Sequence, residues 1–403
     1  MAPKIDTWAG LVFGVTVIVL LLLCQDTEAD TRQSMKDIEA MHINEMLKHQ
    51  LQEEEKKAGK RKGHRVYLNE TTPDETNQHP YMKAGIVRDV LQSYTKYREM
   101  IRVNGGKFTM GTNDPDSETG EYPPRHAAVQ GFYLDANPII NAEYWAFRKA
   151  KKFLKTDAEK KGWSWVVDLF LSNETRQYYS MPGPLGWAAV KRAYFSAPEG
   201  PDSNLENRWT HPAVHVSWYD AKNFCEFHGK RLPTEEEWEY AAKVGVTTHA
   251  YPWGDRWERR RANVWQGKWP KENKKIDGYS MTSPVDAYVP QNLAGFYDMI
   301  GNVWEWTSTA YVERKVQPHL RSPQAVLKGG SYVDSVSGEV NYAVRNSQRM
   351  GQKQDYSAGN VGFRCAKGLS DFGDKFMRKT TPPPEKPKMK RRKIFYRRNK
   401  DEL

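Results

Sequence analysis

Long apolar runs are scarce in this 403-residue sequence, and the mean hydropathy of −0.81 excludes a polytopic membrane protein. Internal repeats with a period of roughly 20–50 residues are also missing, which argues against a repeat architecture. Aromatic residues, by contrast, are frequent, with 14 Trp, 21 Tyr and 14 Phe, and this excludes a mostly disordered chain. At roughly 100–200 residues per domain, the length fits one large domain with extensions, or two domains.

An excess of positive charge is missing from most of the chain, although the formal net charge is +11. Residues 375–403 hold twelve Lys and Arg against three acidic residues, a balance of +9, so the rest of the chain carries only +2. The body is therefore close to neutral. We expect the tail to be disordered and extended, either as a solvated spacer or as a segment attracted by acidic proteins or an anionic membrane surface.

Both ends of the chain carry targeting signals. Residues 8–24 form an uncharged stretch of 17 residues, which indicates either a signal peptide cleaved within residues 1–29 or an uncleaved signal anchor in the membrane. The chain ends in the endoplasmic reticulum retention signal that a receptor reads, made of Lys400, Asp401, Glu402 and Leu403. We therefore expect a protein of the endoplasmic reticulum lumen, with the retention-signal receptor as a partner and no nucleic-acid partner.

Two further features agree with a lumenal address. Asn69 and Asn173 each begin an Asn-Glu-Thr sequon and are candidate N-glycosylation sites. Outside the targeting segment only Cys225 and Cys365 remain. In an oxidising compartment they most simply pair, and the alternative is two buried thiols. A disulfide that closes so long a loop would contribute about 4–5 kcal/mol in the chain-entropy model.

Composition divides the chain into four parts. Residues 1–29 hold the signal peptide or signal anchor. Residues 30–102 are expected to form a charged helix and a transition, where the helix is a solvated stalk or binds a partner. The body spans residues 103–368, and the basic tail spans residues 369–403.

Helical signals in the body are few. Apolar periodicity predicts one helix within residues 138–155 and another over residues 220–229. A third helix is predicted to begin after Thr234, because Thr234 and Glu237 have the spacing of a capping box. The sequence after this helix is rich in turn residues. These features favour an α+β fold with few regular strands and much irregular backbone.

Five sequence blocks carry a resemblance to a known family. They are residues 211–218 (HPAVHVSW), 229–242 (GKRLPTEEEWEYAA), 301–307 (GNVWEWT), 329–332 (GGSY) and 362–365 (GFRC). In this order and spacing they make residues 103–367 resemble the sulfatase-modifying-factor family, whose founding member is the formylglycine-generating enzyme. Three shorter stretches look most like the family's inactive endoplasmic reticulum paralog, and they are residues 110–113, 162–164 and 263–267.

The resemblance implies a fold, a disulfide and an active site. The fold would be a single C-type-lectin-like domain of the formylglycine-generating-enzyme type, and Cys225 and Cys365 would form the family's structural disulfide. Active members oxidise a sulfatase cysteine to formylglycine with O2 and a copper ion held by two cysteines. The first cysteine position corresponds here to Asp334, and the second falls near Glu339.

Asp334 and Glu339 cannot replace these thiols. Carboxylates bind soft Cu(I) poorly, and they cannot form a mixed disulfide with a substrate thiol. We therefore expect no copper and no enzymatic activity. The pair could instead serve a hard metal or acid–base chemistry, but we favour the interpretation that both are exposed loop acids. Ser331 and Trp304 match other active-site positions and are expected to act as scaffold and pocket lining.

The resemblance also implies two calcium sites. The residues of the first are Asn263, Val264, Asp277 and Tyr279, and those of the second are Asp298, Gly301, Val303 and Glu305. Side-chain oxygens combined with backbone carbonyls form the hard-oxygen environment that Ca²⁺ prefers. The alternative is that these acids only form hydrogen bonds with local backbone. Calcium is the one cofactor that we expect.

The function implied is that of a catalytically inactive lumenal member of the family. It would bind sulfatases, the active enzyme or both, and would modulate formylglycine formation. The alternatives are a divergent metal-dependent oxidase and a lectin-like or chaperone-like binding protein, the latter supported by fold analogy alone. The sequence leaves open whether the protein forms homo- or heterodimers.

Overall fold

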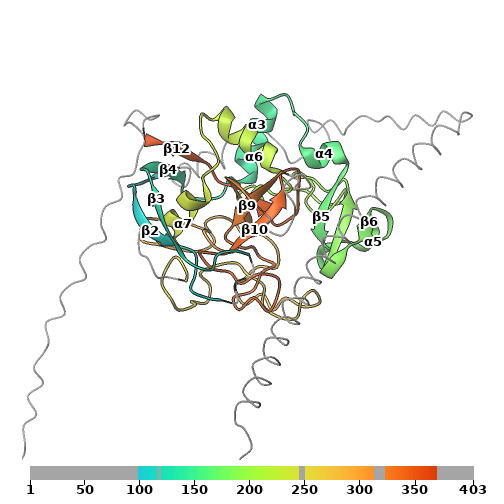
Figure 1. Cartoon of the computed structure of the whole chain (residues 1–403). Coiled ribbons are helices and arrows are strands. Elements are labelled where there is room, and N and C mark those ends of the chain that lie inside the picture. Colours follow the sequence, from blue (N-terminus) through green and yellow to red (C-terminus); the bar gives the residue numbers. More distant parts are fainter. Residues whose placement is uncertain (1–98, 116, 118, 245–249, 313–322, 370–403) are drawn as a thin grey trace, which may run out of the picture.

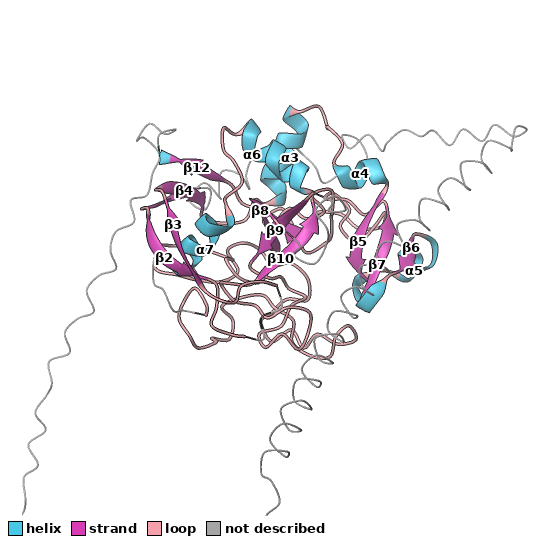
Figure 2. Ribbon diagram, viewed as in Figure 1, coloured by secondary structure: helices cyan, strands magenta, loops and turns pink. Residues whose placement is uncertain are grey.

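The computed structural model of the chain describes residues 99–115, 117, 119–244, 250–312 and 323–369 (Figure 1). Short helices and strands are joined by long loops, which fill one whole side of the molecule in Figure 2. Within the described ranges, no helix has both the length and the hydropathy that crossing a membrane requires. The α+β class with little regular secondary structure is thus confirmed. The targeting segment, residues 30–98 and residues 370–403 lie outside the described part.

A four-stranded sheet lies in the middle of the molecule (Figure 1). Its strands, in the order β10–β9–β8–β11, are β10 (Arg349–Lys353), β9 (Gln324–Lys328), β8 (Trp304–Ala310) and β11 (Val361–Gly362). Strands β8, β9 and β10 are antiparallel, whereas β11 runs parallel to β8. Mainly turns were expected in this part of the chain, so the sheet corrects that expectation. The sequence of strand β8 does not reveal the sheet, because residues 304–307 are all buried. Their side chains therefore lack the alternation of apolar and polar residues that marks a half-exposed strand.

Three smaller sheets surround the central one. Their strands are β1 (Met100–Val103), β4 (Phe132–Asp135) and β12 (Ala366–Gly368); β2 (Gly106–Met110) and β3 (Arg125–Val129); and β5 (Trp163–Val167), β7 (Trp187–Lys191) and β6 (Ser180–Pro182). In the first sheet β4 is central, and in the last β7 is central. Strand β1 begins at Met100, three residues before the expected start of the body.

Short helices cover these sheets. They are α3 (Asn141–Ala150), α4 (Asp157–Lys161), α5 (Asn173–Tyr178), α6 (Trp218–Phe227) and α7 (Glu235–Lys243), with 3-10 turns η2 (Asp168–Phe170) and η3 (Pro184–Gly186). The capping box before α7 is confirmed, since Glu237 N donates to Thr234 Oγ1 and Thr234 N donates to the Glu237 carboxylate. Helix α3 is shorter than predicted because Lys152 and Phe153 adopt positive φ angles of 52° and 56°, which end a helix.

The expected disulfide is confirmed, and the alternative of two free thiols is wrong. Cys225 of α6 is bonded to Cys365, 140 positions further along the chain, and both residues are fully buried. Aromatic rings pack around this bond, with the ring of Phe224 centred 5.3 Å from that of Phe363 and 5.8 Å from that of Tyr144. The disulfide thereby joins helix α6 to the strand β12 region inside the largest apolar core.

Candidate functional site

The segment after the Gly-Gly-Ser-Tyr block turns its first acid inward. Asp334 is 1% exposed. Its Oδ2 accepts hydrogen bonds from the Ser331 amide at 2.8 Å and the Ser331 hydroxyl at 2.6 Å, and its Oδ1 accepts one from the Tyr342 amide at 3.2 Å. The expectation of an exposed loop acid is therefore wrong for Asp334. It holds for Glu339, whose side chain is exposed, so the structure does not bring the two carboxylates together as a pair.

Burial raises the pKa of Asp334 to about 7, and the hydrogen bonds from Ser331, Tyr342 and Trp304 oppose this rise. The Asn360 side chain adds one more link, because its Nδ2 donates to Ser331 Oγ at 3.0 Å. Ser331 and Trp304 are both buried and support this carboxylate. The arrangement satisfies an acid inside the protein, as a buried polar group requires.

The donor set around Asp334 does not fit copper. The carboxylate of Asp334 and the hydroxyl of Ser331 are hard oxygen ligands, whereas Cu(I) requires thiolate or thioether ligands. Cys225 and Cys365 are consumed by the disulfide, so neither can supply a thiolate. No step of copper chemistry can be assigned to these residues.

A half-buried aromatic patch adjoins this segment. Val333, next to Asp334, belongs to a small apolar cluster against which four partly exposed side chains pack: Phe170, Trp187, Trp269 and Met281. We call these four residues the aromatic patch. Trp269 Nε1 donates to the Leu185 carbonyl at 2.6 Å, and Leu185 beside it is 57% exposed. An apolar surface therefore lies beside Asp334.

The first set of calcium residues fits a cation. Asn263 is 1% exposed, and its Oδ1 has no hydrogen-bond partner within the described residues. Asp277 is joined to the segment that contains Asn263. Its Oδ2 accepts a hydrogen bond from the Val264 amide at 2.9 Å, and its Oδ1 accepts one from the Tyr279 amide at 3.0 Å. Burial raises the pKa of Asp277, so a cation would relieve the cost of its charge. The unpaired amide oxygen of Asn263 and the carboxylate of Asp277, which is bonded to the amide of the next residue, Val264, are the kind of oxygen ligands that a hard cation prefers.

Glu305 of the second set is already partnered. Arg364 Nε and Nη2 donate to Glu305 Oε2 and Oε1 at 2.6 and 2.7 Å, and Trp238 Nε1 donates to Oε2 at 2.8 Å. A carboxylate offers about four lone-pair positions, so Oε1 keeps one for a cation. The positive charge of Arg364 counts against a cation at Glu305.

The rest of the second set forms a tight turn against the first. Burial raises the pKa of Asp298 to about 7. Gly301 has a φ of +79°, and a Cβ added there would lie 2.6 Å from the Asn263 carbonyl oxygen, so only glycine permits this close approach. Gly301 and Val303 would offer backbone carbonyls. The two sets of residues therefore lie in directly contacting loops.

Comparison with known proteins places the chain in a family. The profile described as "Sulfatase-modifying factor enzyme 1-like domain" matches residues 88–369. The chain belongs to this family. The protein named "Inactive C-alpha-formylglycine-generating enzyme 2" of Bos taurus is 43% identical over 271 residues, 67% of this chain and 88% of the relative. Its namesake of Mus musculus is 44% identical over 268 residues, 66% of this chain and 85% of the relative.

Relatives of this family that are named as enzymes are almost as similar. The "Formylglycine-generating enzyme" of Mus musculus is 42% identical over 281 residues, 66% of this chain and 74% of the relative. Overall identity thus hardly separates the two classes of relative.

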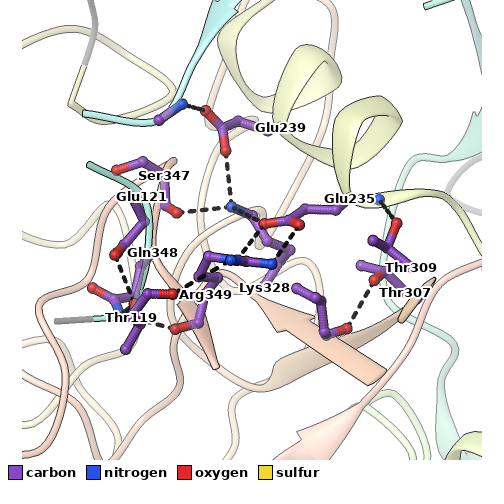
Figure 3. Close-up of polar contacts among 12 residues, drawn as sticks. Thr119, Glu121, Glu235, Glu239, Thr307, Thr309, Lys328, Ser347, Gln348 and Arg349 are labelled. Atoms are coloured by element: carbon purple, nitrogen blue, oxygen red, sulfur yellow. Dashed lines mark hydrogen bonds and ion pairs between the residues drawn. The ribbon is translucent and has the colours of Figure 1, made fainter. Parts of the chain in front are cut away.

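A buried ionic network in the family domain was missed by sequence analysis (Figure 3). Lys328 of β9 is fully buried, and its Nζ lies 2.9 Å from Glu239 Oε2, 2.9 Å from the Ser347 carbonyl oxygen and 3.6 Å from Glu235 Oε1. Lys243 Nζ donates to Glu239 Oε1 at 2.7 Å. Burial alone would raise the pKa of Glu239, but the two ammonium groups hold it below its usual range. Only the spacing of Glu239 and Lys243 on α7 signalled any of these contacts.

A pocket of about 40 Å³ opens beside this network. Glu121, Glu235 and Arg349 are among its lining residues. Glu235 and Arg349 are paired, with Glu235 Oε1 2.9 Å from Arg349 Nε. The volume suits one or two water molecules rather than an organic ligand, so we assign this region to stability and not to binding.

Several predicted site residues cannot be placed. Asn69 and the retention signal at residues 400–403 lie outside the described residues. Asn173, in contrast, is exposed at the start of α5, after the cap Ser172. Its side chain is accessible on the surface of the family domain.

Proposed function

We propose that this protein is a non-catalytic member of the family that binds sulfatases, the active formylglycine-generating enzyme or both, and thereby modulates formylglycine formation. The environment of Asp334 carries the proposal. The position that corresponds to a copper-binding thiol holds a buried carboxylate that accepts three hydrogen bonds, and Glu339 points into solvent. Similarity to relatives named inactive supports the same conclusion.

The aromatic patch supports the binding part of the proposal. Aromatic and methionine side chains are enriched at protein interfaces, and the four of the aromatic patch pack against the small apolar cluster that contains Val333. Such a surface suits an extended peptide segment with apolar residues. It would bind a sulfatase chain around its cysteine without acting on it.

We propose the endoplasmic reticulum lumen as the place of action. The retention signal at residues 400–403 and the sequons at Asn69 and Asn173 motivate this location. The buried disulfide between Cys225 and Cys365 agrees with an oxidising compartment.

We also propose calcium as a structural cofactor. Asn263, Asp277 and the carbonyls of Val264 and Tyr279 would hold the tighter ion, and residues 298–305 the weaker one. The bound ion would supply charge neutralisation and loop order rather than chemistry. Calcium-free protein prepared with a chelator is expected to melt at a lower temperature than protein with calcium restored.

A two-part experiment tests the proposal. The full lumenal chain is incubated with a sulfatase-derived cysteine peptide, copper and a reductant, and mass spectrometry looks for the aldehyde; an active formylglycine-generating enzyme serves as the positive control. No aldehyde is expected. Binding of the same peptide is then measured by fluorescence anisotropy. Trp269→Ala is expected to weaken binding at least fivefold, whereas Leu293→Ala, at a site 79% exposed and outside the aromatic patch, leaves it unchanged.

Aldehyde formation by this chain would refute the non-catalytic assignment. Equal peptide binding by wild type and Trp269→Ala would remove the aromatic patch from the proposal. Absence of peptide binding, together with binding to the active enzyme, would leave the active enzyme as the partner.

A further inference from the structure

Asn302 connects three loops that are far apart in the sequence. It is fully buried and adopts a left-handed backbone, with a φ of 59°. Its amide donates to the Asn263 carbonyl at 2.8 Å, and its own carbonyl accepts from the Tyr332 amide at 3.0 Å. Its backbone alone therefore ties the first calcium set to the Gly-Gly-Ser-Tyr block.

The side chain of Asn302 adds further links. Its Nδ2 donates to Asp298 Oδ2 at 2.8 Å and to the Ser283 carbonyl at 3.2 Å. Its Oδ1 accepts from the Ser283 amide at 3.0 Å and from Asn263 Nδ2 at 3.4 Å. Every polar atom of Asn302 is thus engaged. It contacts a carboxylate of the second calcium set, the amide of the first set and the segment that leads to Asp334.

We propose that Asn302 is a positioning residue through which cation binding at the two calcium loops orders residues 331–342 and the aromatic patch beside them. This inference concerns the regulation of the proposed binding surface and rests on the proposed calcium binding. It does not depend on which protein partner binds.

The physical basis is the sharing of one buried hydrogen-bond network. A cation bound by Asn263 or Asp298 restricts the side chains that Asn302 contacts. Because all polar atoms of Asn302 are hydrogen-bonded, that restriction extends to Tyr332, whose amide donates a hydrogen bond to the Asn302 carbonyl. Tyr332 and Val333 form the cluster against which Trp187 and Trp269 pack. Ordering one loop lowers the entropic cost of ordering the next, so the two events are coupled.

The variant Asn302→Gly tests this coupling between the loops. Glycine accepts the left-handed backbone, so both backbone hydrogen bonds remain while the side-chain links to Asp298, Ser283 and Asn263 are lost. Asn207→Gly is the matched control, because Asn207 has a similar φ of 61° but is exposed. Asp298→Asn is a second variant, which removes a ligand charge yet leaves an oxygen for Asn302 Nδ2.

Hydrogen–deuterium exchange of the full lumenal chain, with calcium or with a chelator, tests the proposal. In wild type and Asn207→Gly, calcium is expected to slow exchange both in residues 263–279 and in residues 331–342. In Asn302→Gly, calcium still slows exchange in residues 263–279 but no longer does so in residues 331–342. Without calcium, residues 331–342 of this variant exchange about tenfold faster than in wild type, while helix α6 is unchanged. Asp298→Asn is expected to match wild type in the chelator.

Three results would overturn the inference. They are calcium-insensitive exchange of residues 331–342 in wild type, undiminished calcium protection of these residues in Asn302→Gly, and faster exchange of α6 to the same extent as residues 331–342. The last result would mean general destabilisation rather than positioning. Failure to bind both sulfatases and the active enzyme would refute the proposed function and leave these exchange results unaffected.

Discussion

Replacing Lys328 with methionine tests the energetics of the buried ionic network most directly. The substitution keeps the apolar length of the side chain and removes its ammonium group. Glu239 retains Lys243 and the Gly111 amide, 2.7 Å from its Oε1, but its Oε2 loses the partner at 2.9 Å. The carbonyl of Ser347 also loses its donor. Two buried acceptors are left without partners.

The expected cost is about 4 kcal/mol of unfolding free energy. Removing one partner of a buried ion pair costs about 3–5 kcal/mol, and Lys328 and Glu239 are both fully buried. For a domain of this size, such a loss corresponds to a fall in melting temperature of about 8–16 °C. Guanidinium unfolding gives the free energy from the midpoint and slope, and differential scanning calorimetry gives the melting temperature.

Lys222→Met is the control for Lys328→Met. Lys222 pairs with Glu226 at 3.7 Å, and both side chains are about half exposed, so its removal should cost less than about 1 kcal/mol. The loss in Lys328→Met should shrink as the pH falls. With one ammonium gone, the folded-state pKa of Glu239 rises above its unfolded value, so protonation in acid restores part of the stability. A loss equal to that of the control, or one independent of pH, would refute the reasoning.

Three other outcomes are expected. Replacing Cys225 and Cys365 together with serine lowers the unfolding free energy by about 5 kcal/mol, because the crosslink spans 140 positions; equilibrium unfolding measures this, and a loss under 1 kcal/mol would contradict it. Burial lowers the pKa of His215 to about 4, so as the pH falls the unfolded chain binds a proton at this residue before the folded chain does. The unfolding free energy therefore decreases by about 3 kcal/mol between pH 6.5 and pH 4. His215→Asn, which tolerates the φ of 59°, should remove this part of the pH slope, and an unchanged slope would exclude His215 as its source. Calcium affinity at the proposed second site should fall about tenfold per pH unit below pH 7, since the cation displaces a proton from Asp298, whose pKa burial raises to about 7. Calorimetric titration of the variant Asn263→Ala, which removes the proposed first site, measures the affinity of the second site alone. An affinity independent of pH would contradict the assignment of Asp298 as a ligand.

The local parts of the fold were predictable from sequence. The start of helix α7 follows from Thr234 and Glu237, because a capping box involves residues only three positions apart. The central sheet was not predictable in this way. Its register pairs Trp306 with Leu327, which lies 21 positions further along the chain, and strands buried on both faces lack the alternation that marks a strand.

The same distinction applies to the candidate site. The family resemblance located Asp334 and the calcium residues as positions in the chain, but their burial depends on distant partners. Lys328 illustrates this limit, since its main partner, Glu239, lies 89 positions away. A lysine is rarely buried without such a partner, and no local pattern identifies that partner in advance.

The way in which Asp334 is buried bears on what the protein does. Placing an unpaired carboxylate in the interior costs several kcal/mol, so a buried acid without donors would be expected to distort its loop. Here the Ser331 amide, the Ser331 hydroxyl and the Tyr342 amide all donate to it, and the loop closes around it. These bonds keep Tyr332 and Val333 in place beneath Trp187 and Trp269. The structure therefore keeps the surface around Asp334 in order, as the proposed binding role requires.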